Sequence, residues 1–167
     1  THSTLDYRTQ ATGKWQYAKN IQANPQYNLG LSGITIYTTD STAGFRFIFK
    51  PGIIREHFKI IKVFCRTSST SFNLSVKSSA MDAPLLIQCN DNNLDGMATI
   101  HLPAISDTID FKIIKNNSQQ KYFECYGILI ESTNPTGILY NSVGINGAGY
   151  RSILRQNLME QQLKQLK

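Results

Sequence analysis

The stretch FRFIF at residues 45–49 decides the fold, because phenylalanines alternate with other residues along it. A period of two places Phe45, Phe47 and Phe49 on one face of an extended chain. The stretch therefore predicts a β-strand with one buried face.

Similar short stretches, rich in β-branched and aromatic residues, lie on both sides of it and are divided by Ser, Thr, Asn, Asp and Gly. They cover residues 33–38, 58–65, 72–76, 85–89, 98–102, 109–114 and 122–130. About eight strands at this spacing, with no helical pattern among them, indicate an antiparallel sheet structure. We expect a mainly β fold, a jelly-roll-like antiparallel β-sandwich, over residues 31–132.

The composition is that of a globular domain, with 41% hydrophobic and 17% charged residues. The net charge is +6, but the Lys and Arg residues are scattered rather than clustered, so nucleic-acid binding is not predicted. An anionic polymer such as a cell-wall glycan is equally compatible with this charge. No apolar run reaches the roughly 18–20 residues that span a bilayer, so no membrane span is predicted.

Cys65, Cys89 and Cys125 show no CxxC spacing, which argues against a zinc site and a disulfide framework. Each cysteine lies in or beside a predicted strand, so we expect all three to be small buried side chains. One disulfide with a spare thiol stays open as an alternative. The acidic stretch at residues 91–96 resembles a calcium loop only superficially, so no metal is predicted.

The segments on either side of the predicted sandwich differ from it. Residues 1–30 are polar and turn-rich, which predicts an irregular N-terminal arm packed on the sandwich. After the turn at residues 134–137, residues 138–143 predict a strand, and a glycine-rich turn follows. Residues 151–167 predict a helix, with Leu154, Leu158, Leu163 and Leu166 at roughly helical spacing. Strand, turn and helix together predict the start of an α/β domain over residues 137–167.

The glycine-rich turn, GINGAG at residues 144–149, is similar to nucleotide-binding loops in its glycine content. Its spacing differs from the GxGxxG of dinucleotide-binding folds, and the Lys-Ser/Thr pair of a phosphate-binding loop is missing. A tight turn without chemistry of its own is the plainer interpretation. No cofactor is predicted.

The stretch YNSVGINGA at residues 140–148 resembles the second conserved block of SGNH (GDSL-like) hydrolases. It is most similar to bacterial peptidoglycan or polysaccharide O-acetylesterases with an inserted β-sandwich, and the DYR and GKWQ stretches near the N-terminus resemble the start of that insert. The resemblance implies that the N–H of Gly147 donates to the oxyanion. It also implies that Gly144, Asn146 and Ala148 support the turn.

The resemblance also shows which parts of an esterase the chain lacks. No GDS motif with the family's nucleophilic Ser occurs here, and the chain ends before the blocks that carry the family's GxN Asn and DxxH His. His2, His57 and His101 all precede the matched block. We therefore expect a fragment with negligible turnover. It would be the accessory β-sandwich of an exported, periplasmic or cell-envelope esterase that removes O-acetyl groups from polysaccharide. Its partners would be the remaining hydrolase domain and acylated polysaccharide or peptidoglycan.

A second hypothesis is a carbohydrate- or protein-binding β-sandwich without a catalytic role, whose C-terminal helix packs on it. Trp15 and Tyr17 are the candidate glycan contacts, because they are large aromatic residues in a polar segment. The alternative for Trp15 is that its ring plugs one end of the sandwich, since a large ring is usually buried.

Overall fold

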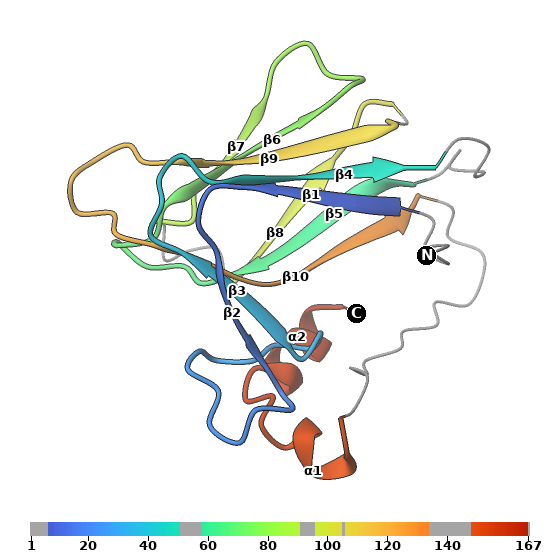
Figure 1. The fold of residues 1–167 in the computed structure, drawn as a ribbon. Coiled ribbons are helices and arrows are strands. Elements are labelled where there is room, and N and C mark those ends of the chain that lie inside the picture. Colours follow the sequence, from blue (N-terminus) through green and yellow to red (C-terminus); the bar gives the residue numbers. More distant parts are fainter. Residues whose placement is uncertain (1–6, 51–57, 91–95, 105, 134–147, 167) are drawn as a thin grey trace.

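Two five-stranded antiparallel sheets form the sandwich in the computed structural model, which describes residues 7–50, 58–90, 96–104, 106–133 and 148–166. Sheet A has the order β1 (Tyr7–Thr12), β4 (Gly44–Phe49), β9 (Thr108–Ile114), β6 (Asn73–Ser78), β7 (Leu85–Ile87). Sheet B has the order β2 (Gln16–Lys19), β3 (Ile34–Thr38), β10 (Phe123–Ser132), β5 (Phe58–Cys65), β8 (Met97–His101). The two sheets face each other across the core (Figure 1).

The predicted antiparallel sandwich is confirmed, and β3–β10 overlap the stretches from which it was predicted. The N-terminal segment differs from the prediction of an irregular arm, because it contains β1 and β2. Every residue of β1 is exposed, so its sequence carries no alternation of buried and exposed residues. Pairing with β4, from Tyr7 opposite Phe49 to Thr12 opposite Gly44, makes this segment a strand.

A cluster of phenylalanine rings packs within the largely aliphatic core between the sheets. The Phe111 side chain is almost completely buried and stacks on Phe45 with ring centroids 4.7 Å apart. Phe47 meets the same ring nearly at a right angle, with centroids 5.8 Å apart. Phe45, Phe47 and Phe49 all pack against the core, as the alternation predicted. The Trp15 ring packs edge-on against Phe45, and its indole N–H donates to the Thr12 carbonyl at 2.8 Å.

The C-terminal residues form two short helices, α1 (Tyr150–Ile153) and α2 (Met159–Gln165), rather than the single helix predicted over 151–167. They pack through polar side chains on the segment between β2 and β3. The Gln156 amide donates to the carbonyls of Gly30 and Leu31, both at 2.9 Å, and the Leu31 N–H donates to the Gln162 amide oxygen at 2.7 Å.

The predicted leucine stripe is therefore not the main packing face, although Leu158 and Leu166 are half-buried. Leu154 is 77% exposed and Leu163 is 46% exposed, whereas the buried residues of this segment are Ser152, Gln156 and Gln162. The physical reason is that backbone groups of residues 29–31 need hydrogen-bond partners. Gln156 and Gln162 supply them to residues 30 and 31, and Asn157 Oδ1 accepts from the Leu29 N–H at 2.9 Å.

The partial α/β unit predicted over 137–167 is not supported. The described C-terminal residues lie against sheet B (Figure 1), as the second hypothesis expected. The predicted strand at 138–143 and the turn residues Gly144, Asn146 and Gly147 lie outside the described residues. Ala148 is half-buried and has no regular secondary structure. No helix in the described part of the chain has the length and apolar character needed to cross a membrane.

Candidate functional site

A row of polar and aromatic side chains crosses the outer face of sheet B. Gln16 in β2 is opposite Tyr37 in β3, and Tyr37 is opposite Glu124 in β10. The Arg66 N–H, just after β5, donates to the Glu124 carbonyl at 2.9 Å. Side chains alternate between the two faces of a strand, and the neighbouring Cys125 faces the core. These four side chains therefore share the outer face.

Three tyrosines stack in this row, and Tyr27, Tyr37 and Tyr122 are called the tyrosine row below. The rings of Tyr27 and Tyr37 are 4.5 Å apart and nearly parallel at 12°, and those of Tyr37 and Tyr122 are 5.6 Å apart at 19°. The Tyr27 hydroxyl donates to the Gln16 amide oxygen. Burial raises the pKa of both Tyr27 and Tyr37 above the usual value for tyrosine.

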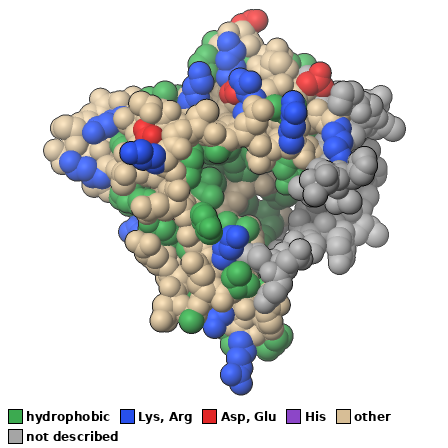
Figure 2. Space-filling view, in the orientation of Figure 1, with side chains coloured by type: hydrophobic (Ala, Val, Ile, Leu, Met, Phe, Trp, Pro, Cys, Tyr) green, Lys and Arg blue, Asp and Glu red, His purple; other side chains and the backbone are tan. Residues whose placement is uncertain are grey.

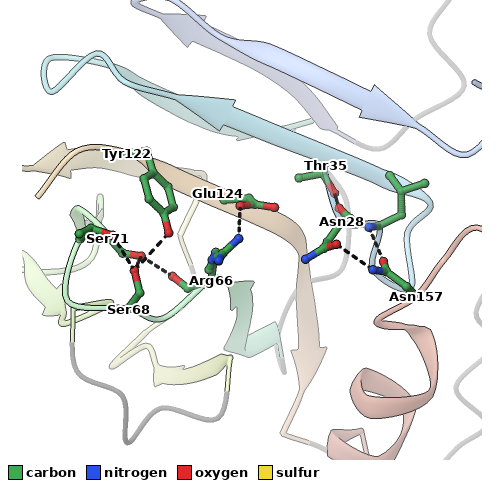
Figure 3. A network of polar contacts seen from close by, with 10 residues as sticks. Asn28, Thr35, Arg66, Ser68, Ser71, Tyr122, Glu124 and Asn157 are labelled. Carbon is green, nitrogen blue, oxygen red and sulfur yellow. Dashed lines mark hydrogen bonds and ion pairs between the residues drawn. The ribbon is translucent and has the colours of Figure 1, made fainter. Parts of the chain in front are cut away.

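The loop between β5 and β6, residues 66–71, holds Tyr122 in place (Figure 3) and is called the serine loop below. Ser68 Oγ lies 3.2 Å from the Tyr122 hydroxyl and 3.1 Å from Ser71 Oγ, and Ser71 Oγ donates to the Arg66 carbonyl at 3.0 Å. Burial acts to raise the pKa of Tyr122, but hydrogen bonds with Ser68 and Thr70 and the charge of Arg66 together lower it.

Arg66 is the charged group that this arrangement presents to solvent. Its Nη1 atom lies 3.7 Å from Glu124 Oε2, and its Cζ atom lies 5.8 Å from the centre of the Tyr122 ring (Figure 3). The Arg66 side chain is 49% exposed, whereas that of Glu124 is 4% exposed. Burial raises the pKa of Glu124, and the charge of Arg66 opposes that rise. The carboxylate and the ring therefore orient a guanidinium group whose donors can reach a ligand.

A cavity of about 300 Å³ opens beside Arg66, between α2 and sheet B, and is called the polar cavity below. Hydrogen-bonding side chains line much of it, namely Arg66, Thr67, Tyr126, Gln161, Gln162 and Gln165. One wall is α2, which approaches sheet B closely because residue 30 is glycine. A Cβ atom on Gly30 would lie 2.7 Å from Tyr126 Cβ, which is shorter than real contacts allow.

A second hollow, the apolar cleft, lies between the two sheets and has a volume of about 400 Å³. Figure 2 shows hydrophobic side chains gathered there. Its lining includes Tyr7, Trp15, Ile34, Ile36, Phe45, Phe47 and Ile128. A polar ligand would find few hydrogen-bonding partners in this cleft, so the outer face of sheet B is the better candidate for polar recognition.

The two aromatic residues singled out from the sequence lie away from the tyrosine row. Trp15 lines the apolar cleft. Tyr17 is 60% exposed and pairs with Ile36, which faces the core, so its side chain leaves β2 on the face opposite to Gln16. The Lys19 ammonium lies 5.0 Å from the centre of the Tyr17 ring. The structure brings neither residue to the polar cavity.

Comparison with known proteins gives structural likeness only. No family model and no curated protein match the chain. A family 32 carbohydrate-binding module (CBM32) produced by Clostridium perfringens is 10% identical, with a TM-score of 0.48 over 76% of this chain and 94% of that one. The family 32 module of C. perfringens NanJ, in complex with galactose, is 14% identical, with a TM-score of 0.45 over 75% and 93%. The CBM32 of AlyQ, in complex with 4,5-unsaturated mannuronic acid, is 13% identical, with a TM-score of 0.44 over 74% and 93%.

These findings correct the SGNH resemblance. The similar structures are carbohydrate-binding modules rather than SGNH hydrolases, and no family model supports the matched block. The predictions of an esterase accessory portion and of a hydrolase-domain partner are therefore wrong. The oxyanion role of Gly147 depended on that resemblance, and Gly147 lies outside the described residues. At these identities the likeness says nothing of what this chain binds, so its ligand has to be argued from the outer face of sheet B.

Proposed function

We propose that the outer face of sheet B binds a carbohydrate, with one sugar unit in the polar cavity. The observation that carries this proposal is the half-exposed Arg66, held between Glu124 and Tyr122 at that cavity. Sugar hydroxyls both donate and accept hydrogen bonds. The guanidinium donates, and glutamine amides such as Gln161 donate and accept, so the cavity offers both kinds of partner.

The size and the surroundings of the polar cavity support the same ligand class. A volume of about 300 Å³ is at the lower end of the range for small-molecule sites, which suits a single sugar unit better than a folded partner. The nearby tyrosine row offers apolar ring surface with polar hydroxyls, and such groups can contact both the C–H and the O–H groups of a sugar. Neighbouring units of a polysaccharide would then lie along the tyrosine row.

The charge of the site favours glycans that are neutral or acidic over those that are basic. Arg66 is the exposed ion, while the carboxylate of Glu124 is buried behind it. The whole chain carries a net charge of +6, which attracts an anionic polymer at low salt. The proposal includes export of the protein to the cell envelope, where such polymers occur.

Affinity electrophoresis in gels that contain polysaccharide tests the proposal. We expect retarded migration in at least one of pectin, alginate, galactan and soluble peptidoglycan, with a Kd between about 1 μM and 1 mM. Serum albumin in the same gels controls for non-specific retardation, and 0.3 M NaCl in a parallel gel controls for simple charge attraction. Unretarded migration with every neutral and acidic polymer would contradict carbohydrate binding.

A further inference from the structure

Two thiols from opposite sheets meet in the core directly beneath the serine loop. Cys65 is the last residue of β5 in sheet B, and Cys89 follows β7 of sheet A. Their Sγ atoms are 3.4 Å apart, and both residues are completely buried. Cys125 is opposite Cys65 in the β5–β10 pairing, but its Sγ turns toward the Gly127 carbonyl, 3.6 Å away. Cys89 is therefore the partner toward which Cys65 is directed.

We propose that Cys65 and Cys89 form a disulfide when the chain folds under oxidising conditions, and that Cys125 stays a free thiol. An S–S bond is about 2.05 Å long, so the two Sγ atoms, which already touch at 3.4 Å, approach by a further ~1.4 Å when the bond forms. Each thiol gives up one proton, one S–S bond forms, and two electrons pass to a disulfide oxidant such as oxidised glutathione, which becomes two thiols.

The disulfide forms during folding, because the native fold buries both thiols. A buried thiol cannot be reached by the oxidant, and thiol exchange needs the thiolate. The hydrogen bond with Cys89 and burial both raise the pKa of Cys65 in the folded protein, and burial raises the pKa of Cys125 to about 12. In the unfolded chain the thiols are accessible, and folding then brings Cys65 and Cys89 together.

The crosslink would fix the segment that positions Arg66. Arg66 follows Cys65 directly, and the Ser68 N–H donates to the Cys89 carbonyl at 3.1 Å. A Cys65–Cys89 bond therefore anchors the serine loop at its start and through its contact with residue 89. The effect on ligand binding rests on the proposed carbohydrate function, whereas the disulfide itself does not.

Refolding the full chain from guanidinium chloride, in a glutathione redox buffer or in a reductant, tests the proposal. After oxidative refolding we expect one free thiol per chain and a Cys65–Cys89 peptide pair by non-reducing mass spectrometry. The Tm should exceed that of the reduced protein by roughly 5–10 °C. Three free thiols, or a Cys65–Cys125 pair, would overturn the proposal.

Two alanine variants serve as matched controls. Cys125→Ala should keep the crosslink and the Tm difference between oxidised and reduced protein, whereas Cys89→Ala should lose both. Polysaccharide binding is then measured on oxidised and reduced wild type. A mapped crosslink without any binding would reject the carbohydrate function alone, and binding without a crosslink would reject the disulfide alone.

Discussion

Replacing Arg66 with methionine is expected to weaken polysaccharide binding roughly 10- to 100-fold. Methionine keeps an unbranched apolar side chain but removes every donor that Arg66 offers to the polar cavity. A hydrogen bond to a charged group contributes about 1.5–3 kcal/mol, which corresponds to this range of affinity. Isothermal titration calorimetry with the polysaccharide that retards the wild type measures the change.

The same substitution has a second effect, because Arg66 is the ion-pair partner of the buried Glu124. Without Arg66 the pKa of Glu124, already raised by burial, rises further. A carboxyl group whose folded-state pKa is raised destabilises the fold when it is ionised, so Arg66→Met should regain stability as the pH falls through that pKa. The double variant Arg66→Met/Glu124→Gln removes this effect and should still bind weakly.

Arg46→Met is the matched control for the loss of an exposed arginine. Arg46 is 47% exposed and pairs with Asp110 in sheet A, away from the polar cavity. We expect the affinity of Arg46→Met for the polysaccharide to stay within about twofold of the wild type, because Arg46 does not line the polar cavity. An equal loss in both variants would indicate general charge attraction, and unchanged binding by Arg66→Met would remove Arg66 from the site.

Phe111→Ala is expected to lower the free energy of unfolding by about 3–5 kcal/mol, the usual cost of deleting a buried aromatic ring. Phe111 is 1% exposed and contacts Phe45 and Phe47, so its removal leaves a cavity at the centre of the core. Guanidinium unfolding followed by circular dichroism measures the change.

Leu86→Ala is the control for Phe111→Ala, because the Leu86 side chain is 47% exposed. It should alter the free energy of unfolding by no more than about 0.5 kcal/mol. A loss below about 1 kcal/mol for Phe111→Ala would show that this ring is not central to the core.

The strands could be predicted from the sequence because a buried face imposes alternation. Phe45, Phe47 and Phe49 carry that pattern, and the structure packs all three against the core. The exposed residues of β1 carry none, so only the pairing with β4 makes this segment a strand. The helical pattern of leucines was misleading for a different reason, since Gln156 and Gln162 make the contacts to the sandwich instead.

The candidate site was harder to predict because its parts come from distant segments. Trp15 and Tyr17 are aromatic residues in a polar stretch, which predicted glycan contacts, but neither lines the polar cavity. A usable signal was the alternation in KYFECY, which places Tyr122, Glu124 and Tyr126 on one face. The position of Arg66 beside Glu124 follows from strand pairing and could not be read from the sequence.

The SGNH resemblance rested on a short glycine-rich stretch. Gly and Asn are common in tight turns of many folds, because they tolerate backbone conformations that other residues avoid. A short match at residues 140–148 therefore specifies a turn more strongly than it specifies a catalytic family.

The most direct test of where a carbohydrate binds is an NMR titration of the ¹⁵N-labelled protein with an oligosaccharide of the retarding polysaccharide. We expect the largest amide shifts in residues 65–71, 122–126 and 159–165, which surround the polar cavity and Tyr122. Shifts concentrated instead in β1 and β4, around the apolar cleft, would contradict binding on the outer face of sheet B.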